Sequence, residues 1–217
     1  MKRTFLYFIF FILIITNQNK VFGQPDHLQP AGNIFTTITY QLEYYLEVKK
    51  ILIDCFPGTI ETQFLMLPSF FPERYLCIIG DGSGEYFEIN YSKSSRSIFS
   101  VSMGADTSRL TVSRYSKIID KPSVELIKSV YSSALKKMKT RTDSVWRPDG
   151  TTYFFTANMD FLVTGVLQWN TAGENMKELI SVNEYLIYLV ETTKDSTVYL
   201  EESFKARFNK LKVNLDK

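Results

Sequence analysis

Short apolar segments separated by tight turns constrain this chain more than any other feature. The clearest pair, 74–79 and 85–91, flanks a Gly-Asp-Gly-Ser-Gly turn at 80–84. Between Glu85 and Tyr91 polar and apolar side chains alternate, which is the period of a strand with one buried face. Glycine and aspartate tolerate the backbone conformations that hairpin turns require. The sequence therefore predicts a β-hairpin here.

The same pattern recurs along the chain, and helical patterns follow it. Further strands are expected at 63–67, 97–103, 109–115, 151–157 and 163–169. Helices are expected at 35–50, 122–139, from 175 onward, and at 200–212. Because the connections between successive strands are short, the strands should run antiparallel. We therefore expect an α+β fold, with an antiparallel sheet of about six or seven strands and amphipathic helices packed on one face.

Two of the expected helices carry start signals. Pro122 follows Asp120 and Lys121, and proline is favoured in the first helical turn. Asn175 is followed three residues later by Glu178, which is the spacing of a capping box. Both signals predict where a helix begins.

The first 23 residues have the pattern of a signal peptide. Lys2 and Arg3 precede an apolar run of 11 residues from Phe5 to Ile15. A membrane-spanning helix needs about 20 apolar residues, whereas a run of this length is typical of a signal-peptide core. Val21 and Gly23 suit cleavage after Gly23. The alternatives are a buried strand and a single membrane anchor.

Cleavage would leave a flexible leader at 24–33 and one domain at 34–217. The leader contains two prolines, a glycine and the only histidine, His27. Residues 1–23 carry three basic residues and no acidic one, so their removal changes the formal net charge from +2 to about −1. A nearly neutral domain has no global field to attract nucleic acid. We expect export to the periplasm or the extracellular medium, with no stable membrane anchor after cleavage. A lipid anchor is not expected either, because it needs a cysteine immediately after the cleavage site and the nearest is Cys55.

The two cysteines form a disulfide candidate. Cys55 and Cys77 enclose 21 residues. In an oxidising compartment such a bridge contributes roughly 3 kcal/mol. The alternative is two buried free thiols, since cysteine is among the residues most often buried.

Three segments carry a family resemblance. They are 67–73 (LPSFFPE), 149–155 (DGTTYFF) and 165–169 (GVLQW). In this respect the chain resembles an uncharacterised family of exported bacterial proteins, chiefly from Bacteroidetes, with P-S-F-x-P-E and D-G-T-x-Y-x-F motifs. Asn170 stands where a proline often follows in that family. The resemblance covers about residues 60–192 and implies a shared fold, with no activity to transfer.

The usual catalytic and metal motifs are missing from the sequence. It contains no HExxH, CxxC, GxxxxGK[ST] or GxSxG pattern. Its only histidine lies in the expected leader, so a Ser-His-Asp or Cys-His site within the domain is excluded. Two cysteines do not complete a zinc site. We expect no metal and no cofactor.

Two groups of acidic residues were weighed as sites. In the turn at 80–84, glycines could cradle a phosphate, or Asp81, Ser83 and Glu85 could ligate Ca²⁺, but no lysine follows and a strand comes next. We favour a plain hairpin loop. Asp149 together with Asp160 or Glu88 would offer the acid and base of a glycosidase if the fold brought them together.

A basic cluster and two tryptophans are the remaining binding candidates. The cluster of Lys136, Lys137, Lys139 and Arg141, with Arg147 beyond it, would suit a phosphate-bearing glycan or an acidic protein surface. The alternative is a solvated helix C-terminus, where cations complement the dipole. Of the tryptophans, Trp146 in an expected loop is the surface candidate, and Trp169, at a strand end, is expected in the core.

Together these features favour a non-catalytic binding or interaction module of the bacterial envelope, of the inhibitor or immunity-protein kind. Its partner would be a protein or an envelope polymer. The alternative is a carboxylate-based hydrolase acting on an envelope glycan or peptide. The third possibility is a purely structural domain.

Overall fold

The computed structural model describes residues 26–31, 41–104, 110–140, 150–168 and 172–217. Its elements in chain order are β1 (Gln29–Pro30), α3 (Leu42–Val48), the π-helix η2 (Lys49–Ile53), β2 (Thr59–Pro68), β3 (Arg74–Gly80), β4 (Phe87–Ser94), α4 (Ile98–Ser102), β5 (Val112–Ile119), α5 (Lys121–Lys136), β6 (Thr151–Asn158), β7 (Leu162–Gln168), α6 (Glu174–Thr192), β8 (Thr197–Val198) and α7 (Glu202–Asp216).

The strands form one sheet in the order β1-β7-β6-β2-β3-β4-β5-β8. Every neighbouring pair is antiparallel except β5 and β8, which are parallel. The α+β class and the antiparallel sheet are thus confirmed. The sheet has eight strands because two-residue strands, β1 and β8, are added at its edges.

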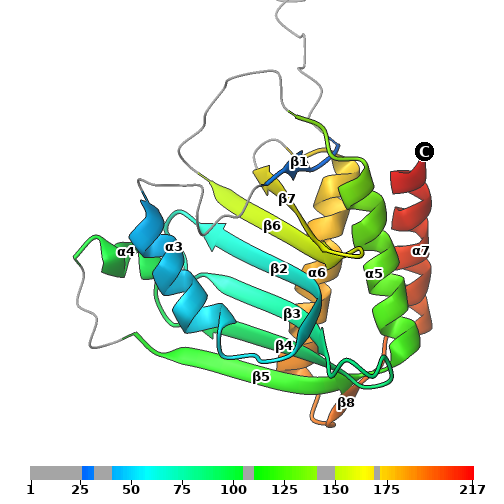
Figure 1. Cartoon of the computed structure of the whole chain (residues 1–217), viewed down its shortest axis with the longest axis horizontal. Helices are drawn as coiled ribbons and strands as arrows, with labels where there is room; N and C mark the ends of the chain where they lie inside the picture. The colour runs from blue at the N-terminus through cyan, green and yellow to red at the C-terminus, as the bar shows by residue number, and fades with distance from the viewer. Residues whose placement is uncertain (1–25, 32–40, 105–109, 141–149, 169–171) are drawn as a thin grey trace, which may run out of the picture.

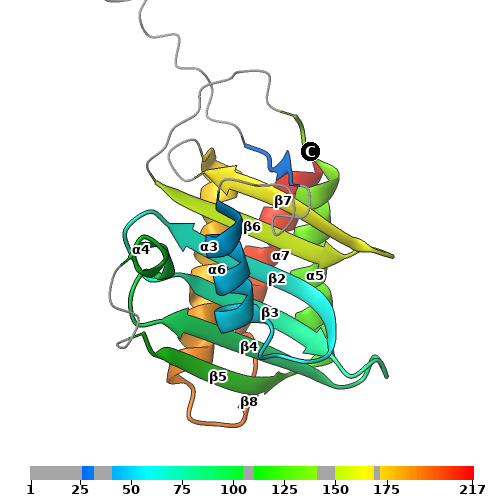
Figure 2. The same ribbon diagram turned by 60° about the vertical axis from the view of Figure 1, so that its left-hand side comes forward.

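Helices cover both faces of the sheet (Figures 1 and 2). The three long helices α5, α6 and α7 share one apolar cluster with one face, and α7 packs against α5 and α6. The short helices α3, η2 and α4 share a second cluster with the other face. Along β2 the side chains alternate between the two, with Phe64 and Met66 in the first cluster and Leu65 and Leu67 in the second. The helices on the second face are an addition to the one-sided packing that we expected.

Helix α5 begins as its sequence signal indicates. The side chain of Asp120 accepts a hydrogen bond from the backbone N–H of Ser123 at 3.0 Å, and Pro122 lies in the first turn. Val124, Ile127, Val130, Tyr131 and Ala134 face the sheet cluster. Local spacing and a local cap therefore specify this helix.

The strand expected at 97–103 is wrong, because residues 98–102 form the short helix α4. Ser97 caps the helix and accepts a hydrogen bond from the Ser100 N–H. The distant carboxylate of Glu73 accepts two more, from the N–H groups of Ile98 and Phe99 at 2.7 and 3.1 Å. These bonds satisfy N–H groups of the first turn that otherwise lack partners, and the sequence pattern of 97–103 contains no sign of the distant carboxylate.

Residues 26–31, which we expected in a flexible leader, are part of the domain. Leu28 is fully buried, and β1 pairs with β7. A Cβ atom at Gly165 would lie 2.9 Å from the Leu28 side chain, so the missing side chain makes room for this contact. The carboxylate of Asp26 also accepts the N–H groups of Asn175 and Met176, at 2.7 and 3.1 Å.

Asp26 therefore caps the start of α6, in place of the local capping box expected from Asn175 and Glu178. The residue at the N-cap of α6 is Gly173, which has no side chain to offer. Glu178 instead pairs with Arg207 of α7, with Oε2 2.8 Å from Nη2. The start of α6 is thus fixed from outside the helix.

The burial of Leu28 generates a prediction. Leu28→Ala should lower the free energy of unfolding by about 3 kcal/mol, because it removes a fully buried side chain and leaves a cavity. The measurement is urea-induced unfolding monitored by circular dichroism. The control is the half-buried neighbour in His27→Ala, which should cost less than about 1 kcal/mol. Equal stability of Leu28→Ala and the wild type would show that 26–31 is not docked in solution.

Candidate functional site

A groove of about 560 Å³ lies at one end of the sheet. It forms where β2 and β4 end and where β3 and β6 begin. Its lining residues are Met66, Pro68, Phe71, Pro72, Arg74, Lys93, Ser94, Ser95, Thr151 and Tyr153. Several of them belong to the 67–73 and 149–155 segments singled out in the sequence, so we call it the motif groove. Its size falls within the range of about 300–1,000 Å³ that is usual for ligand pockets.

Strand register brings the two segments together. In the antiparallel ladder of β2 and β6, Pro68 lies opposite Thr151 and Met66 lies opposite Tyr153. Beyond the ladder, the Ser69 hydroxyl donates to the Gly150 carbonyl at 2.7 Å and accepts from the Gly150 N–H at 3.1 Å. Two segments about 80 residues apart in the sequence therefore form one wall of the groove.

Two adjacent phenylalanines project from the loop that borders the groove. Phe70 and Phe71 are 74% and 70% exposed. Prolines at 68 and 72 flank them, and neither proline offers an N–H to extend the sheet. Isolated exposed apolar residues are common, but a neighbouring pair of large ones beside a groove is a feature of contact surfaces.

The cations of the groove are already neutralised by α6. Arg74 makes two hydrogen bonds to Glu184, at 2.5 and 2.8 Å, and Lys93 pairs with Glu191. Burial alone would lower the pKa of Arg74, but the Glu184 carboxylate outweighs it and the pKa is raised. Burial also raises the pKa of Tyr153, so its phenol stays neutral at physiological pH. The groove thus offers apolar walls and paired charges.

A fully buried carboxylate, Glu73, anchors the C-terminal end of the loop that carries Phe70 and Phe71. Besides the two N–H groups of α4, it accepts the hydroxyls of Tyr44, Ser94 and Ser97 at 3.2, 3.1 and 3.3 Å. The backbone of Glu73 is also bonded to Ser94. The Glu73 N–H donates to the Ser94 hydroxyl at 3.1 Å, and the Ser94 N–H donates to the Glu73 carbonyl at 3.2 Å. A carboxylate with five donors costs little to bury, and it ties β3, β4, α3 and α4 to one point.

Of the basic residues proposed from the sequence, the three that the structure describes do not line this groove. Lys136 lines a different depression, beside the β6–β7 hairpin. The Lys137 ammonium donates to the Asp216 carbonyl at 3.2 Å. Lys139 is exposed, and its backbone N–H donates to the Leu28 carbonyl. Arg141, Trp146, Arg147 and Trp169 lie outside the described residues.

Both cysteines are free thiols in the structure. Cys55 is half-buried, and its Sγ donates to the Leu52 carbonyl at 3.4 Å. Cys77 is buried on β3, and burial raises the pKa of its thiol to about 12. Of the two alternatives open from the sequence, the structure has the unbonded pair.

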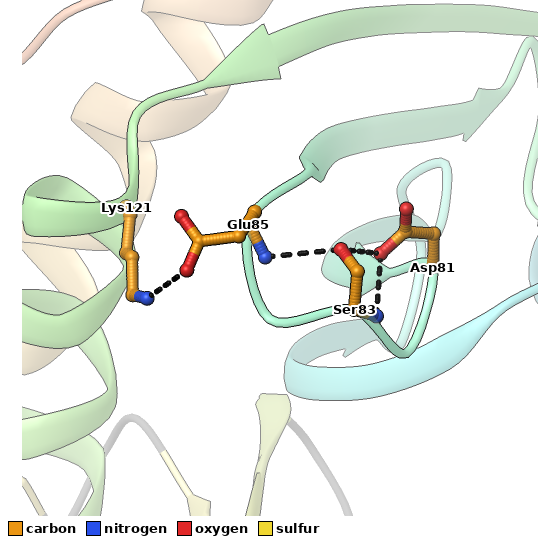
Figure 3. Close-up of polar contacts among 4 residues, drawn as sticks. All are labelled: Asp81, Ser83, Glu85 and Lys121. Atoms are coloured by element: carbon orange, nitrogen blue, oxygen red, sulfur yellow. Dashed lines mark hydrogen bonds and ion pairs between the residues drawn. The ribbon is translucent and has the colours of Figure 1, made fainter.

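The glycine-rich turn is a hairpin loop, as we favoured (Figure 3). Asp81 Oδ1 accepts the N–H and the hydroxyl of Ser83 at 2.8 and 2.6 Å, and the Ser83 hydroxyl accepts the Glu85 N–H at 3.1 Å. The two hydrogen bonds from Ser83, that of its hydroxyl first, lower the pKa of Asp81. Glu85 in turn pairs with Lys121 at 2.7 Å. The candidate ligand groups of Asp81 and Ser83 are thus used within the loop, and that of Glu85 is used by Lys121 of α5.

The acidic residues weighed for hydrolysis lie on separate elements. Glu88 on β4 accepts the hydroxyls of Tyr86 and Ser116 at 2.9 and 3.4 Å. Asp160 lies in the β6–β7 turn with a φ of 72°. Neither lines the motif groove, and Asp149 falls outside the described residues.

Comparison with family models, with curated proteins and with solved structures gives no match. Within the described residues, no helix has the length and apolarity needed to cross a bilayer. In the same part of the chain, no three His, Cys, Asp or Glu side chains group so as to hold a metal ion.

Sequence reasoning did not identify the motif groove, although a signal was present. The paired phenylalanines between two prolines mark a loop that cannot join the sheet, and such a loop exposes its side chains. What the sequence did not reveal is the register of β2 against β6, which brings Thr151 and Tyr153 to this loop.

The Glu73 cluster generates a prediction. Glu73→Gln should lower the free energy of unfolding by about 2–4 kcal/mol, because the amide NH₂ would face donors and leave buried groups unpaired. Chemical denaturation measures the change. The control, Glu85→Gln, removes only a surface ion pair and should cost less than about 1 kcal/mol. A Glu73→Gln protein as stable as the control would contradict the structural role of the carboxylate.

Proposed function

We propose that this chain is an exported, non-catalytic binding module of the bacterial envelope, of the inhibitor or immunity-protein kind, and that it binds a partner protein through Phe70, Phe71 and the motif groove. The observation that carries the proposal is the exposure of both aromatic side chains, at 74% and 70%, beside a groove of about 560 Å³. Aromatic residues are enriched at protein interfaces, where they act as anchors.

The fixed ends of the loop support this role. Ser69 is bound to Gly150 at one end, and Glu73 is held by five donors at the other. A surface that is ordered before binding loses less conformational entropy when a partner docks. Phe70 and Phe71 are thus presented by a short, anchored segment.

The charge pattern favours a protein partner over an ionic ligand. Arg74 and Lys93 are each paired with a glutamate of α6, so a nucleic acid or a phosphate would have to compete with an existing ion pair. An apolar protein segment would cover Phe71, Pro72 and Met66 and leave both pairs intact. The same pairing argues against the hydrolase alternative at this groove, because Glu184 and Glu191 are engaged by cations.

The binding surface generates a prediction. The double change Phe70→Ser and Phe71→Ser should weaken capture of a saturable partner from envelope extract by about 30-fold or more, which corresponds to the loss of one interface anchor. Quantitative pulldown over a concentration series is the measurement. Thermal unfolding should be unchanged, since both side chains are exposed.

The matched control is Tyr199→Ser, which removes an aromatic residue of equal exposure, 68%, beyond the far edge strand of the sheet. It should capture the partner as the wild type does. Equal capture by the double variant, or equal loss in the Tyr199 control, would contradict the assignment of the surface.

Export generates a separate prediction. When the full chain is expressed with a C-terminal tag in a Gram-negative host, the purified protein should begin at Gln24, as shown by intact mass. Phe10→Arg, which interrupts the apolar run from Phe5 to Ile15, should leave the precursor uncleaved in the cytoplasm. A wild-type protein that retains residues 1–23 in the cytoplasmic fraction would overturn the export proposal. The binding surface would still be tested separately by the phenylalanine variants.

A further inference from the structure

A second depression, of about 520 Å³, lies beside the β6–β7 hairpin. We call it the hairpin pocket. Its lining residues are Glu61 at the start of β2, Asn158, Met159 and Asp160 at the end of β6, and Lys128, Ser132 and Lys136 on α5. In the β2–β6 ladder, Thr62 pairs with Ala157 near this pocket and Pro68 pairs with Thr151 near the motif groove. The two depressions therefore lie at opposite ends of the same strands.

The hairpin pocket is rich in polar groups that remain open to a ligand. Glu61 and Lys128 form an ion pair. Four further side chains line the pocket and make no hydrogen bond or ion pair to the described part of the chain. They are those of Ser132, Lys136, Asn158 and Asp160. They supply a hydroxyl, an ammonium, an amide and a carboxylate, so donors and acceptors are both available.

The charges of the hairpin pocket balance. Lys128 and Lys136 offset Glu61 and Asp160. A small anion would meet two carboxylates, and a small cation would meet two ammonium groups, so neither is favoured. A neutral ligand with many hydroxyls can hydrogen-bond to groups of both signs without separating the existing pair.

Exposed apolar side chains follow the hairpin pocket in the sequence. Met159 lines the pocket, and Phe161 and Leu162, two and three residues further along the chain, are 70% and 52% exposed. The Met159 N–H donates to the Phe161 carbonyl at 2.9 Å, which closes the turn around Asp160. A pyranose ring has apolar C–H faces that pack on such a surface while its hydroxyls bind polar neighbours.

We propose that the hairpin pocket binds a neutral saccharide. Asp160 and Asn158 would accept hydrogen bonds from sugar hydroxyls, Lys136 would donate to ring or hydroxyl oxygens, and Phe161 would cover one sugar face. This site goes beyond the protein-binding surface proposed above, since it shares no lining residue with the motif groove. A protein with both surfaces would hold its partner near a glycan.

The test is a titration of the purified, isotope-labelled protein, followed by two-dimensional amide NMR. The probes are neutral trisaccharides of glucose, mannose, galactose and N-acetylglucosamine, with α and β linkages, and inorganic phosphate for comparison. At least one trisaccharide should give saturable shifts confined to the amides of 128–136 and 158–162. Asp160→Asn, which suits the positive φ of this position, and Asn158→Ala should each weaken binding about tenfold.

The matched control is Lys137→Met, the residue that follows Lys136 at the end of α5, whose ammonium donates to the Asp216 carbonyl. It should bind the trisaccharide as the wild type does, whereas Lys136→Met should bind more weakly. Three outcomes would each overturn the proposal. They are the absence of saturable shifts with every trisaccharide, stronger shifts with phosphate, and unchanged binding in both Asp160→Asn and Asn158→Ala. Because Phe70→Ser and Phe71→Ser leave this pocket intact, that double variant should titrate normally even if the protein-binding proposal fails.

Discussion

The structure depends on a sheet whose central strands are buried on both faces. Phe64 and Met66 of β2 pack under the long helices, while Leu65 and Leu67 pack under α3 and its neighbours. Each such side chain contributes about 1.5–3 kcal/mol when it is fully buried. A strand that is apolar on both sides cannot leave one face in water, so α3, η2 and α4 are required as much as α5 and α6.

With both faces of the central strands occupied, their ends are where a ligand can reach them. The motif groove lies at one end, where β2, β3, β4 and β6 leave the ladder. The hairpin pocket lies at the other end of β2 and β6. Loops at strand ends can vary without disturbing the core. One rigid sheet can therefore present two chemically different surfaces, one aromatic and one polar.

The predictable parts of this fold are those specified locally. Alternation with turn residues identified the 74–91 hairpin, and apolar spacing with Asp120 identified α5. Two of the wrong predictions, the strand at 97–103 and the capping box at Asn175, share a cause, since a distant carboxylate caps each helix start concerned. Glu73 caps α4 from 25 residues away, and Asp26 caps α6 from 149 residues away. A local pattern contains no information about such partners. The site was missed for the same reason, because strand register, rather than residue type, brings Thr151 to Pro68.

Neutralised charge is the property that would make the motif groove selective in the proposed role. If Arg74 and Lys93 lacked Glu184 and Glu191, the groove would attract anions of many kinds. With both pairs formed, long-range attraction is small and an ionic ligand must displace a carboxylate to bind. In the proposed role, shape and apolar contact would then decide what docks, and Phe70 and Phe71 are 74% and 70% exposed beside the groove. A surface of this kind selects a partner by fit over a contact area, as protein interfaces do.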